Sequence, residues 1–134
     1  MTASEVLVTG AGPTGLFAAM ELTRRGIPLR IVDMADQQTK LSKAVGINTQ
    51  SLELLEPSGL TERLLAAGIR IQRANIRFDG ELLVTLDLSQ ARHRFNFILA
   101  LAQSETERIL GEALAERGVT VERQTTLASF EQRT

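Results

Sequence analysis

The chain has 134 residues, with 15 Lys and Arg against 16 Asp and Glu, so its net charge at pH 7 is -1. This length allows one domain or most of one, and the balanced charge gives no reason to expect nucleic acid or an anionic membrane as partner. The absence of cysteine excludes a disulfide framework, a thiolate metal site and a cysteine nucleophile. The apolar run Leu16–Met20 is too short to cross a bilayer, and no basic region precedes it, so we expect a cytoplasmic location.

The chain begins with the pattern of a βαβ unit. Glu5–Thr9 is predicted to be a short buried strand, because apolar and β-branched residues run together there. The glycine-rich stretch Gly10-Ala11-Gly12-Pro13-Thr14-Gly15 follows at once. Leu16–Arg25 is then predicted to be a helix, with basic residues in its last turn. The second strand is predicted at Ile27–Val32, and it ends in Asp33.

The middle of the chain is predicted to hold a loop, two short helices and a hairpin. The polar segment Met34–Lys43 lacks any period and is interpreted as a loop. Asn48 is predicted to cap a helix that continues through Glu56, and Leu60–Ala67 is predicted to be a second helix. Around the tight-turn dipeptide Asp79-Gly80, alternating apolar residues from Arg70 to Leu86 predict a hairpin. Buried positions are expected at Leu52, Leu55, Leu64, Leu65, Ile69 and Ile71.

The last third of the chain is predicted to return to the sheet. Phe95–Leu101 is apolar enough for a strand. Ser104-Glu105-Thr106-Glu107 has the form of a capping box, in which a hydroxyl and a carboxylate each bind a free amide at the start of a helix. That helix is expected to stop at Gly118, before a strand at Val119–Arg123. The alternation in Thr126–Gln132 suggests one strand of a further hairpin.

Together these elements predict an α/β fold of the Rossmann type, a βαβ dinucleotide-binding fold with a parallel sheet. The sheet is expected to contain Glu5–Thr9, Ile27–Val32 and Val119–Arg123. The parallel-sheet core is assigned to residues 4–34 and 104–125, and residues 35–103 to an inserted excursion of helices and hairpin.

The glycine-rich turn predicts a nucleotide site. In this context Gly10 permits the tight turn, Gly12 lets the backbone approach a pyrophosphate, and Gly15 lets the helix pack closely on the strand. Asp33, 18 positions after the last glycine, can accept hydrogen bonds from a ribose. The fingerprint alone does not separate FAD from NAD, since both carry an ADP half. A plain turn with a solvent-exposed Asp33 would leave the three glycines unexplained.

Four blocks resemble one known family in the same order: Gly10–Leu16, Ser42–Ile47, Leu52–Leu55 with Gly59-Leu60, and Ala102–Leu110. They are similar to the start of the FAD-dependent aromatic hydroxylases, the flavoprotein monooxygenases related to p-hydroxybenzoate hydroxylase and to the polyketide and phenol hydroxylases. The resemblance covers nearly the whole chain and implies that residues 1–134 are the N-terminal portion of an FAD-binding domain. It also implies NADPH or NADH as the reductant and a small aromatic substrate in the complete protein.

The resemblance also implies roles for individual residues. The turn residues Gly10, Gly12, Pro13, Thr14 and Gly15 would bind the pyrophosphate of FAD. Asp33 would bind the adenosine ribose, and Gln103 matches a family glutamine that contacts the ribityl chain. Lys43 stands where the family usually has Arg, near the phosphate and ribityl region. The family's later motifs and most of its substrate pocket would follow beyond position 134, so no catalytic residue is assigned and the isolated chain is expected not to complete turnover.

Two other function classes stay open at this point. One is a small NAD(P)-dependent oxidoreductase, although the chain has no Tyr for the Tyr-Lys pair of short-chain reductases. The other is a non-catalytic fragment that binds nothing well. His93, the only histidine, is flanked by Arg92 and Arg94 and is interpreted as a solvated loop residue. No metal site is expected, and a homo-oligomer is left open.

Overall fold

The computed structural model describes residues 6–38, 40 and 46–132. It divides into two compact units, one formed by Met1–Ser42 with Gln103–Thr134 and the other by Lys43–Ala102. No helix in these described ranges is both long and apolar enough to cross a membrane.

A three-stranded parallel sheet organises the first unit. It consists of β1 (Val6–Thr9), β2 (Leu29–Val32) and β8 (Val121–Glu122), in the order β1-β2-β8. Val6 pairs with Leu29 at one end of the sheet and Thr9 with Val32 at the other, so β1 and β2 end side by side. The predicted parallel sheet is therefore confirmed, and its middle strand is the one that leads into Asp33.

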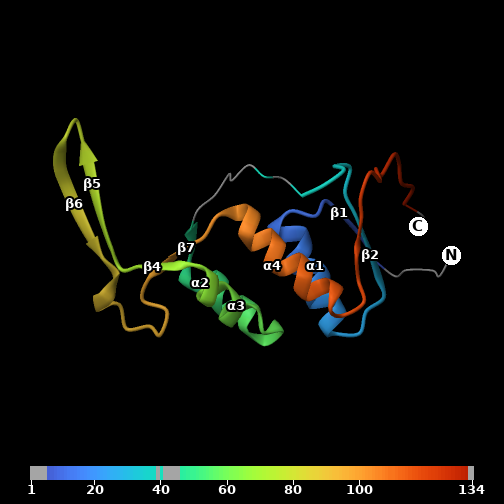
Figure 1. Ribbon diagram of the computed structural model, residues 1–134, viewed down its shortest axis with the longest axis horizontal. Coiled ribbons are helices and arrows are strands. Elements are labelled where there is room, and N and C mark those ends of the chain that lie inside the picture. The colour runs from blue at the N-terminus through green and yellow to red at the C-terminus, as the bar shows by residue number, and fades with distance from the viewer. Residues whose placement is uncertain (1–5, 39, 41–45, 133–134) are drawn as a thin grey trace. The chain divides into compact units, whose positions relative to one another are not determined.

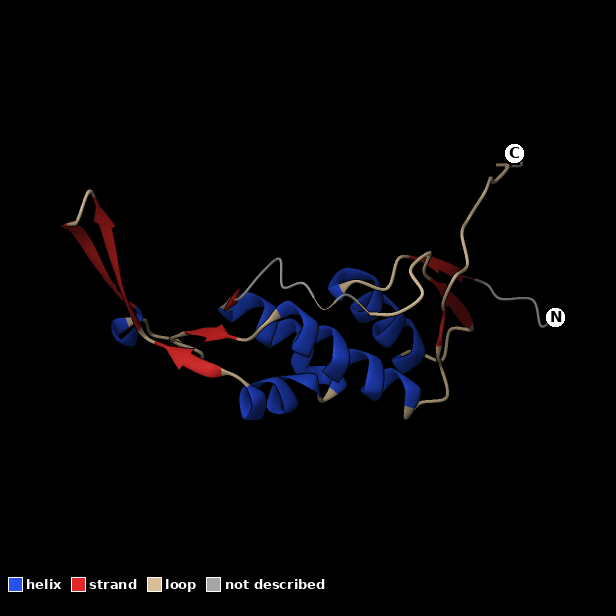
Figure 2. Ribbon diagram, turned by 45° about the horizontal axis from the view of Figure 1, so that its top comes forward, coloured by secondary structure: helices blue, strands red, loops and turns tan. Residues whose placement is uncertain are grey.

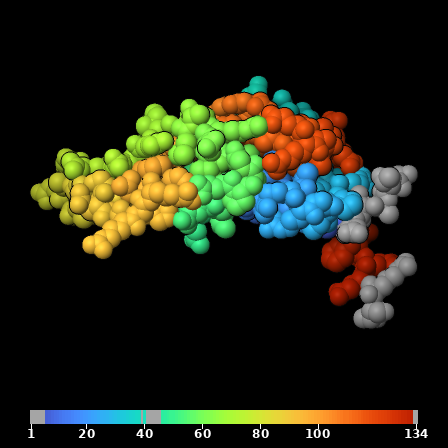
Figure 3. Space-filling model, turned by 90° about the horizontal axis from the view of Figure 1, so that it is seen from below, coloured from blue at the N-terminus to red at the C-terminus, as the bar shows by residue number. Residues whose placement is uncertain are grey.

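Two helices cover one face of this sheet and supply the core of the unit. The α1 helix spans Pro13–Arg24 and the α4 helix spans Gln103–Ala115, and the two lie side by side (Figures 1 and 3). Both connect parallel strands as crossovers, which places their first turns at the edge of the sheet where the strands end. The buried apolar residues are Leu16, Ala19 and Met20 of α1, Ile31 and Val32 of β2, and Ile109, Leu110, Ala113 and Leu114 of α4.

The predicted capping box at the start of α4 is wrong. The helix begins at Gln103, so Ser104 lies inside the first turn instead of before it. The carboxylate of Glu107 accepts a hydrogen bond from the side-chain amide of Gln103 at 2.8 Å. The pattern is therefore correct about a helix start but wrong about the contacts made there.

The predicted strand at Thr126–Gln132 is also absent. After β8, the amides of Gln124 and Thr125 bind the carbonyls of Ala35 and Asp33, and residues 125–132 then have no regular structure. Alternation alone does not form a strand, because the backbone groups need a neighbouring strand to pair with.

The second unit contains two short helices and a small antiparallel sheet. The helices are α2 (Thr49–Leu55) and α3 (Leu60–Ala67), joined by a 3-10 turn at Glu56–Ser58. Both helices are predicted by the sequence, and α3 has the expected bounds. The sheet has the order β3-β7-β4, with strands at Gly46–Ile47, Ile98–Ala100 and Ile69–Ile71. The buried apolar residues of this unit are Leu52, Leu55, Leu60, Leu64, Phe95, Phe97, Leu99 and Leu101.

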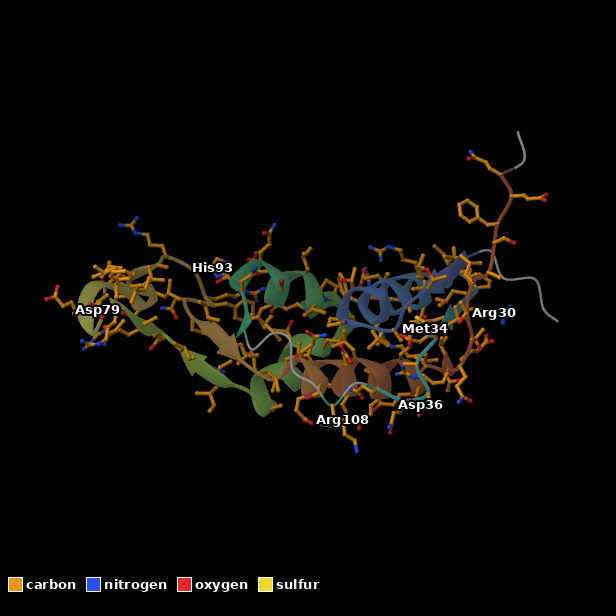
Figure 4. All side chains as sticks on the ribbon, turned by 90° about the horizontal axis from the view of Figure 1, so that it is seen from above. Arg30, Met34, Asp36, Asp79, His93 and Arg108 are labelled. Atoms are coloured by element: carbon orange, nitrogen blue, oxygen red, sulfur yellow. The ribbon has the colours of Figure 1, made fainter. Side chains whose placement is uncertain are left out.

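The predicted hairpin is confirmed, with a shorter first strand than expected. It pairs β5 (Arg73–Phe78) with β6 (Glu81–Asp87) around Asp79-Gly80, and Asp79 marks its tip (Figures 2 and 4). The preceding Ile69–Ile71 pairs instead with β7. Ile69 and Ile71 are 73% and 38% exposed, so the expectation that they are core residues is wrong. Ile69 and Ile71 lie two positions apart, on the same face of β4, and the described part of the chain leaves that face largely uncovered.

His93 lies in the loop before β7, as the sequence suggested, and its side chain is 31% exposed, but two contacts hold it in place. The amide of Phe95 donates to its Nδ1 at 3.0 Å, and its Nε2 lies 2.7 Å from a carboxylate oxygen of Glu53. Nδ1 is an acceptor in this arrangement, so Nε2 carries the proton that Glu53 accepts. Together with the ion pair between Arg94 and Glu56, this contact attaches the loop before β7 to α2 and the turn that follows it.

The cap of α2 provides a test of this unit. The side chain of Asn48 accepts a hydrogen bond from the amide of Ser51 at 2.8 Å. We expect Asn48→Ala to lower the free energy of unfolding by about 1 kcal/mol, because a first-turn amide loses its partner. Urea denaturation of the chain measures the change. Gln50→Ala, at an exposed position of the same helix, is the control, and an equal loss in both variants would contradict the capping role.

Candidate functional site

The glycine-rich turn joins the end of β1 to the first turn of α1. Gly10 has a φ of +95°, a backbone conformation that side-chain-bearing residues rarely adopt, and its amide donates to the carbonyl of Val32 at 2.8 Å. Gly12 is the N-cap of α1, and its carbonyl accepts the first helical hydrogen bond, from Leu16 at 2.9 Å. The turn therefore extends the pairing of β1 with β2 and leads directly into the helix.

The first turn of α1 suits an anion. Pro13, which has no amide hydrogen, occupies the first helical position, and no acidic residue lies in this turn. The amides of Thr14 and Gly15 have no carbonyl one turn earlier to bind, and they carry the positive end of the helix dipole. Backbone amides and dipole together form the type of site that binds phosphate groups.

The space around the glycines shows why the turn has this composition. A Cβ atom on Gly15 would lie 1.9 Å from the carbonyl oxygen of Gly10, so no other residue fits there without moving the backbone. A Cβ on Gly12 would meet nothing within 4 Å. Gly15 is thus required for helix packing, whereas Gly12 faces open space that a ligand can approach. We call this open space beside Gly12, at the start of α1, the phosphate cradle, because it fits a pyrophosphate.

Asp33 connects the end of β2 to this turn. Its Oδ2 accepts a hydrogen bond from the amide of Ala11 at 2.6 Å, and its Oδ1 accepts one from Ala35 at 2.8 Å. Nη1 of Arg123, at the end of β8, lies 3.7 Å from Oδ1. The Asp33 side chain is 17% exposed, so it can still meet a ligand.

The surroundings of Asp33 favour its charged form. Partial burial raises the pKa of this carboxyl group, but the amide hydrogen bonds from Ala11 and Ala35 and the charge of Arg123 lower it by more. The net pKa lies below its ordinary value, so Asp33 is an anion at neutral pH. An anion at the end of the second strand accepts hydrogen bonds from ribose hydroxyls and disfavours a phosphate in their place.

Gln103 begins α4, at the same edge of the sheet as the glycine turn, because both crossover helices start there. A hollow of about 380 Å³ lies between the loop after β2 and the first turns of α4. Gln37, Gln38, Lys40, Ser104, Glu105 and Arg108 line this hollow. The glycine turn and Asp33 do not line it, so it is separate from the phosphate cradle.

The structure thus brings six of the expected site residues into one cluster: Gly10, Gly12, Pro13, Thr14, Gly15 and Asp33. Gln103 lies at the start of the neighbouring helix, and Lys43 lies outside the described residues. Sequence reasoning missed the amide of Ala11 and the guanidinium of Arg123 as partners of Asp33. Arg123 could have been predicted as a partner of Asp33 only from the strand order, because it follows β8 and comes near Asp33 only when β8 pairs with β2. Within the described part of the chain, no group of His, Asp and Glu side chains could hold a metal ion.

Strand, glycine turn, helix and acidic second strand together define a dinucleotide-binding domain of the βαβ type. The comparison with known families agrees: the FAD binding domain family matches residues 3–134, and the chain belongs to that family. The residues of the turn fit the pyrophosphate of that cofactor, since open space and first-turn amides meet at the start of α1.

Individual relatives point the same way. The chain is 38% identical over 120 residues to 6-methylpretetramide 4-monooxygenase from Streptomyces rimosus, covering 88% of this chain and 22% of that protein. It is 38% identical over 106 residues to pentachlorophenol 4-monooxygenase from Sphingobium chlorophenolicum, covering 78% and 20%. The crystal structure of p-nitrophenol 4-monooxygenase from Pseudomonas putida has the same fold, with a TM-score of 0.89 at 22% identity, over 97% of this chain and 34% of that one. The chain therefore spans about a fifth of the length of these curated relatives.

The contact between Gly15 and Gly10 gives a second prediction. We expect Gly15→Ala to destabilise the fold by about 3 kcal/mol, because the new methyl group overlaps a backbone oxygen that cannot move without breaking the turn. Thermal or urea unfolding measures this loss. Gly111→Ala is the matched control, since Gly111 lies within α4 and a Cβ there would meet nothing within 4 Å. Helix propensity favours Ala at that position by up to about 1 kcal/mol. Similar effects at both glycines would rule out the packing role of Gly15.

The hydrogen bonds of Asp33 give a pH-dependent prediction. Because folding lowers the pKa of this carboxyl group, its contribution to stability is complete above the unfolded-state pKa of about 4. The contribution is lost as the pH falls through the lower folded-state pKa. We therefore expect Asp33→Asn to destabilise the chain at pH 7 and to differ less from wild type near pH 2.

Urea titrations at several pH values test this expectation. Asp36→Asn, in the exposed loop beyond β2 (Figure 4), is the control for the removal of a nearby carboxylate and is measured at the same pH values. A constant difference between Asp33→Asn and wild type across the acid range would contradict the prediction.

Proposed function

We propose that this chain binds FAD as part of a flavin-dependent monooxygenase that hydroxylates an aromatic substrate. The observation that carries the proposal is the phosphate cradle at the start of α1, with Asp33 held beside it by the amide of Ala11. Family membership supports FAD over NAD as the bound nucleotide. Both curated relatives described above are monooxygenases by name, which supports the reaction class.

The proposed division of work among the residues follows from the geometry. The amides of Thr14 and Gly15 bind the pyrophosphate, and the absence of a side chain at Gly12 leaves room for it. Asp33 accepts hydrogen bonds from the adenosine ribose. Each carboxylate oxygen has two lone pairs, so the bonds from Ala11 and Ala35 leave capacity for ribose hydroxyls. Gln103 binds the ribityl chain, and Lys43 adds a positive charge near the phosphates.

When bound, the flavin supplies the redox chemistry, with NADPH or NADH as reductant and oxygen as co-substrate. The residues proposed for this chain bind and orient the cofactor, so no acid–base pair is needed among them. The substrate would be a small aromatic molecule bound by other parts of the complete protein. A cytoplasmic location, where pyridine nucleotides supply the electrons, is part of the same proposal.

Nucleotide titrations test the proposal. We expect the chain to bind FAD saturably, with a change in flavin fluorescence, and ADP to compete because most of the proposed contacts involve the ADP half. Asp33→Asn should weaken both FAD and ADP by about tenfold or more, since a charge-assisted hydrogen bond contributes about 1.5–3 kcal/mol.

Asp36→Asn is the matched control, because it removes a nearby carboxylate that faces solvent. It should leave both affinities unchanged at a temperature where every variant is folded. Absence of FAD binding by the folded wild-type chain would refute the proposal.

A further inference from the structure

We infer that Arg123 is a further binding residue for the nucleotide: its guanidinium donates a hydrogen bond to a ribose hydroxyl group, the same group that donates to Asp33. This inference rests on the proposed FAD site and deepens it. It assigns a function to a largely buried guanidinium beside the ribose-binding carboxylate, and it makes the sugar of the nucleotide a determinant of specificity.

The backbone places Arg123 directly beside Asp33. Val32 pairs with Glu122 across β2 and β8, and the amide of Asp33 donates to the carbonyl of Glu122 at 2.9 Å. The amide of Thr125 donates to the carbonyl of Asp33 at 3.0 Å. Continuing the register by one position sets Arg123 opposite Asp33, so the two side chains lie on the same face of the sheet.

The distance between these two side chains leaves the guanidinium open. Nη1 of Arg123 lies 3.7 Å from Oδ1 of Asp33, which is close enough for an ion pair but too long for a hydrogen bond. In the part of the chain that the structure describes, the Arg123 side chain donates no hydrogen bond, although only 27% of it is exposed. A guanidinium has five N–H donors, so this group retains donors for a ligand.

A second arginine of the same sheet shows the contrasting arrangement. Arg30 of β2, labelled in Figure 4, binds Glu122 of β8 through both branches of its guanidinium, at 2.7 and 2.6 Å. Its donors on the side facing Glu122 are therefore occupied, as is usual for a paired arginine and carboxylate. Arg123 has a carboxylate equally near in the sequence pairing but does not close onto it.

Asp33 does not depend on Arg123 for its orientation. Its two oxygens accept hydrogen bonds from the amides of Ala11 at 2.6 Å and Ala35 at 2.8 Å, so backbone groups already hold the carboxylate. If Arg123 only offset the charge of Asp33, its removal would leave a carboxylate that accepts hydrogen bonds at least as strongly. A donor that contacts the ligand, in contrast, is lost with the side chain.

A ribose hydroxyl is the group that fits between the two side chains. A carboxylate only accepts hydrogen bonds and a guanidinium only donates them, whereas a hydroxyl does both. A hydroxyl oxygen at ordinary distances of about 2.7–3.0 Å from each group fits between atoms that are 3.7 Å apart. A phosphate oxygen would not suit this place, because the charge of Asp33 repels it.

The test uses ADP, 2′-deoxy-ADP and 3′-deoxy-ADP, because each deoxy analogue lacks one ribose hydroxyl. We expect Arg123→Met to weaken ADP binding by about tenfold, the effect of losing one hydrogen bond from a charged donor. For the analogue that lacks the shared hydroxyl, variant and wild type should bind within about twofold of each other, since the contact is already missing. Arg30→Met is the matched control and should leave the affinities for all three nucleotides unchanged.

The outcomes separate this inference from the proposed function. Equal losses for ADP and both analogues would overturn the inference, because Arg123 would then act on the fold or on another part of the nucleotide. An ADP affinity that Arg123→Met leaves unchanged would overturn it as well, while the proposed function would stand. If the folded wild-type chain binds neither ADP nor FAD, the proposed function fails and the inference fails with it.

Chemical modification of the wild-type chain gives an independent measurement that needs no folded variant. Phenylglyoxal reacts with accessible guanidinium groups, and mass spectrometry reports the extent of reaction at each arginine. Saturating ADP should slow the modification of Arg123 severalfold and leave that of Arg30 unchanged. Equal rates at Arg123 with and without bound ADP would contradict a direct contact with the nucleotide.

Discussion

The close approach of α1 to the turn that precedes it is the constraint on which the rest of the first unit depends. At Gly15 the helix comes so near to the carbonyl of Gly10 that even a methyl group would overlap it. This contact sets the direction in which α1 leaves the sheet and so the direction in which its first amides point. A phosphate site made of backbone groups is only as well ordered as the backbone, and here helix packing and the pairing of Gly10 with Val32 hold that backbone in place.

The carboxylate of Asp33 extends this order to the second strand. It binds the turn through Ala11 and its own loop through Ala35, so one side chain joins the ends of two neighbouring strands. The same contacts keep it charged, since each amide stabilises the anion more than the proton-bound form. In the proposed function, Asp33 need not be rearranged when the ribose arrives, and this lowers the cost of binding.

At the start of α4 a second carboxylate has a comparable arrangement. Glu107 is buried on the core side of its helix and binds the side chain that begins the helix. Parallel topology brings this helix start to the same edge of the sheet as the glycine turn. In the proposed function the adenosine end of the cofactor lies by the first crossover helix and the ribityl chain by the second. In that proposal, two neighbouring helix starts together bind one extended molecule.

Local sequence was enough to specify the individual elements: the βαβ unit, the helix capped by Asn48, the α3 helix and the hairpin at Asp79-Gly80. Their signals come from residues within one or two turns of each other, so neighbouring side chains suffice to encode them. The class of site was also readable from the sequence, because three glycines and an acidic residue at this spacing meet the needs of a pyrophosphate and a ribose. Long-range packing set the remaining features: the strand order that brings Arg123 to Asp33, the exposure of Ile69 and Ile71, and the burial of Glu107 in place of the expected capping box. These features depend on which surfaces meet, and segments distant in the sequence meet through contacts that no local pattern encodes.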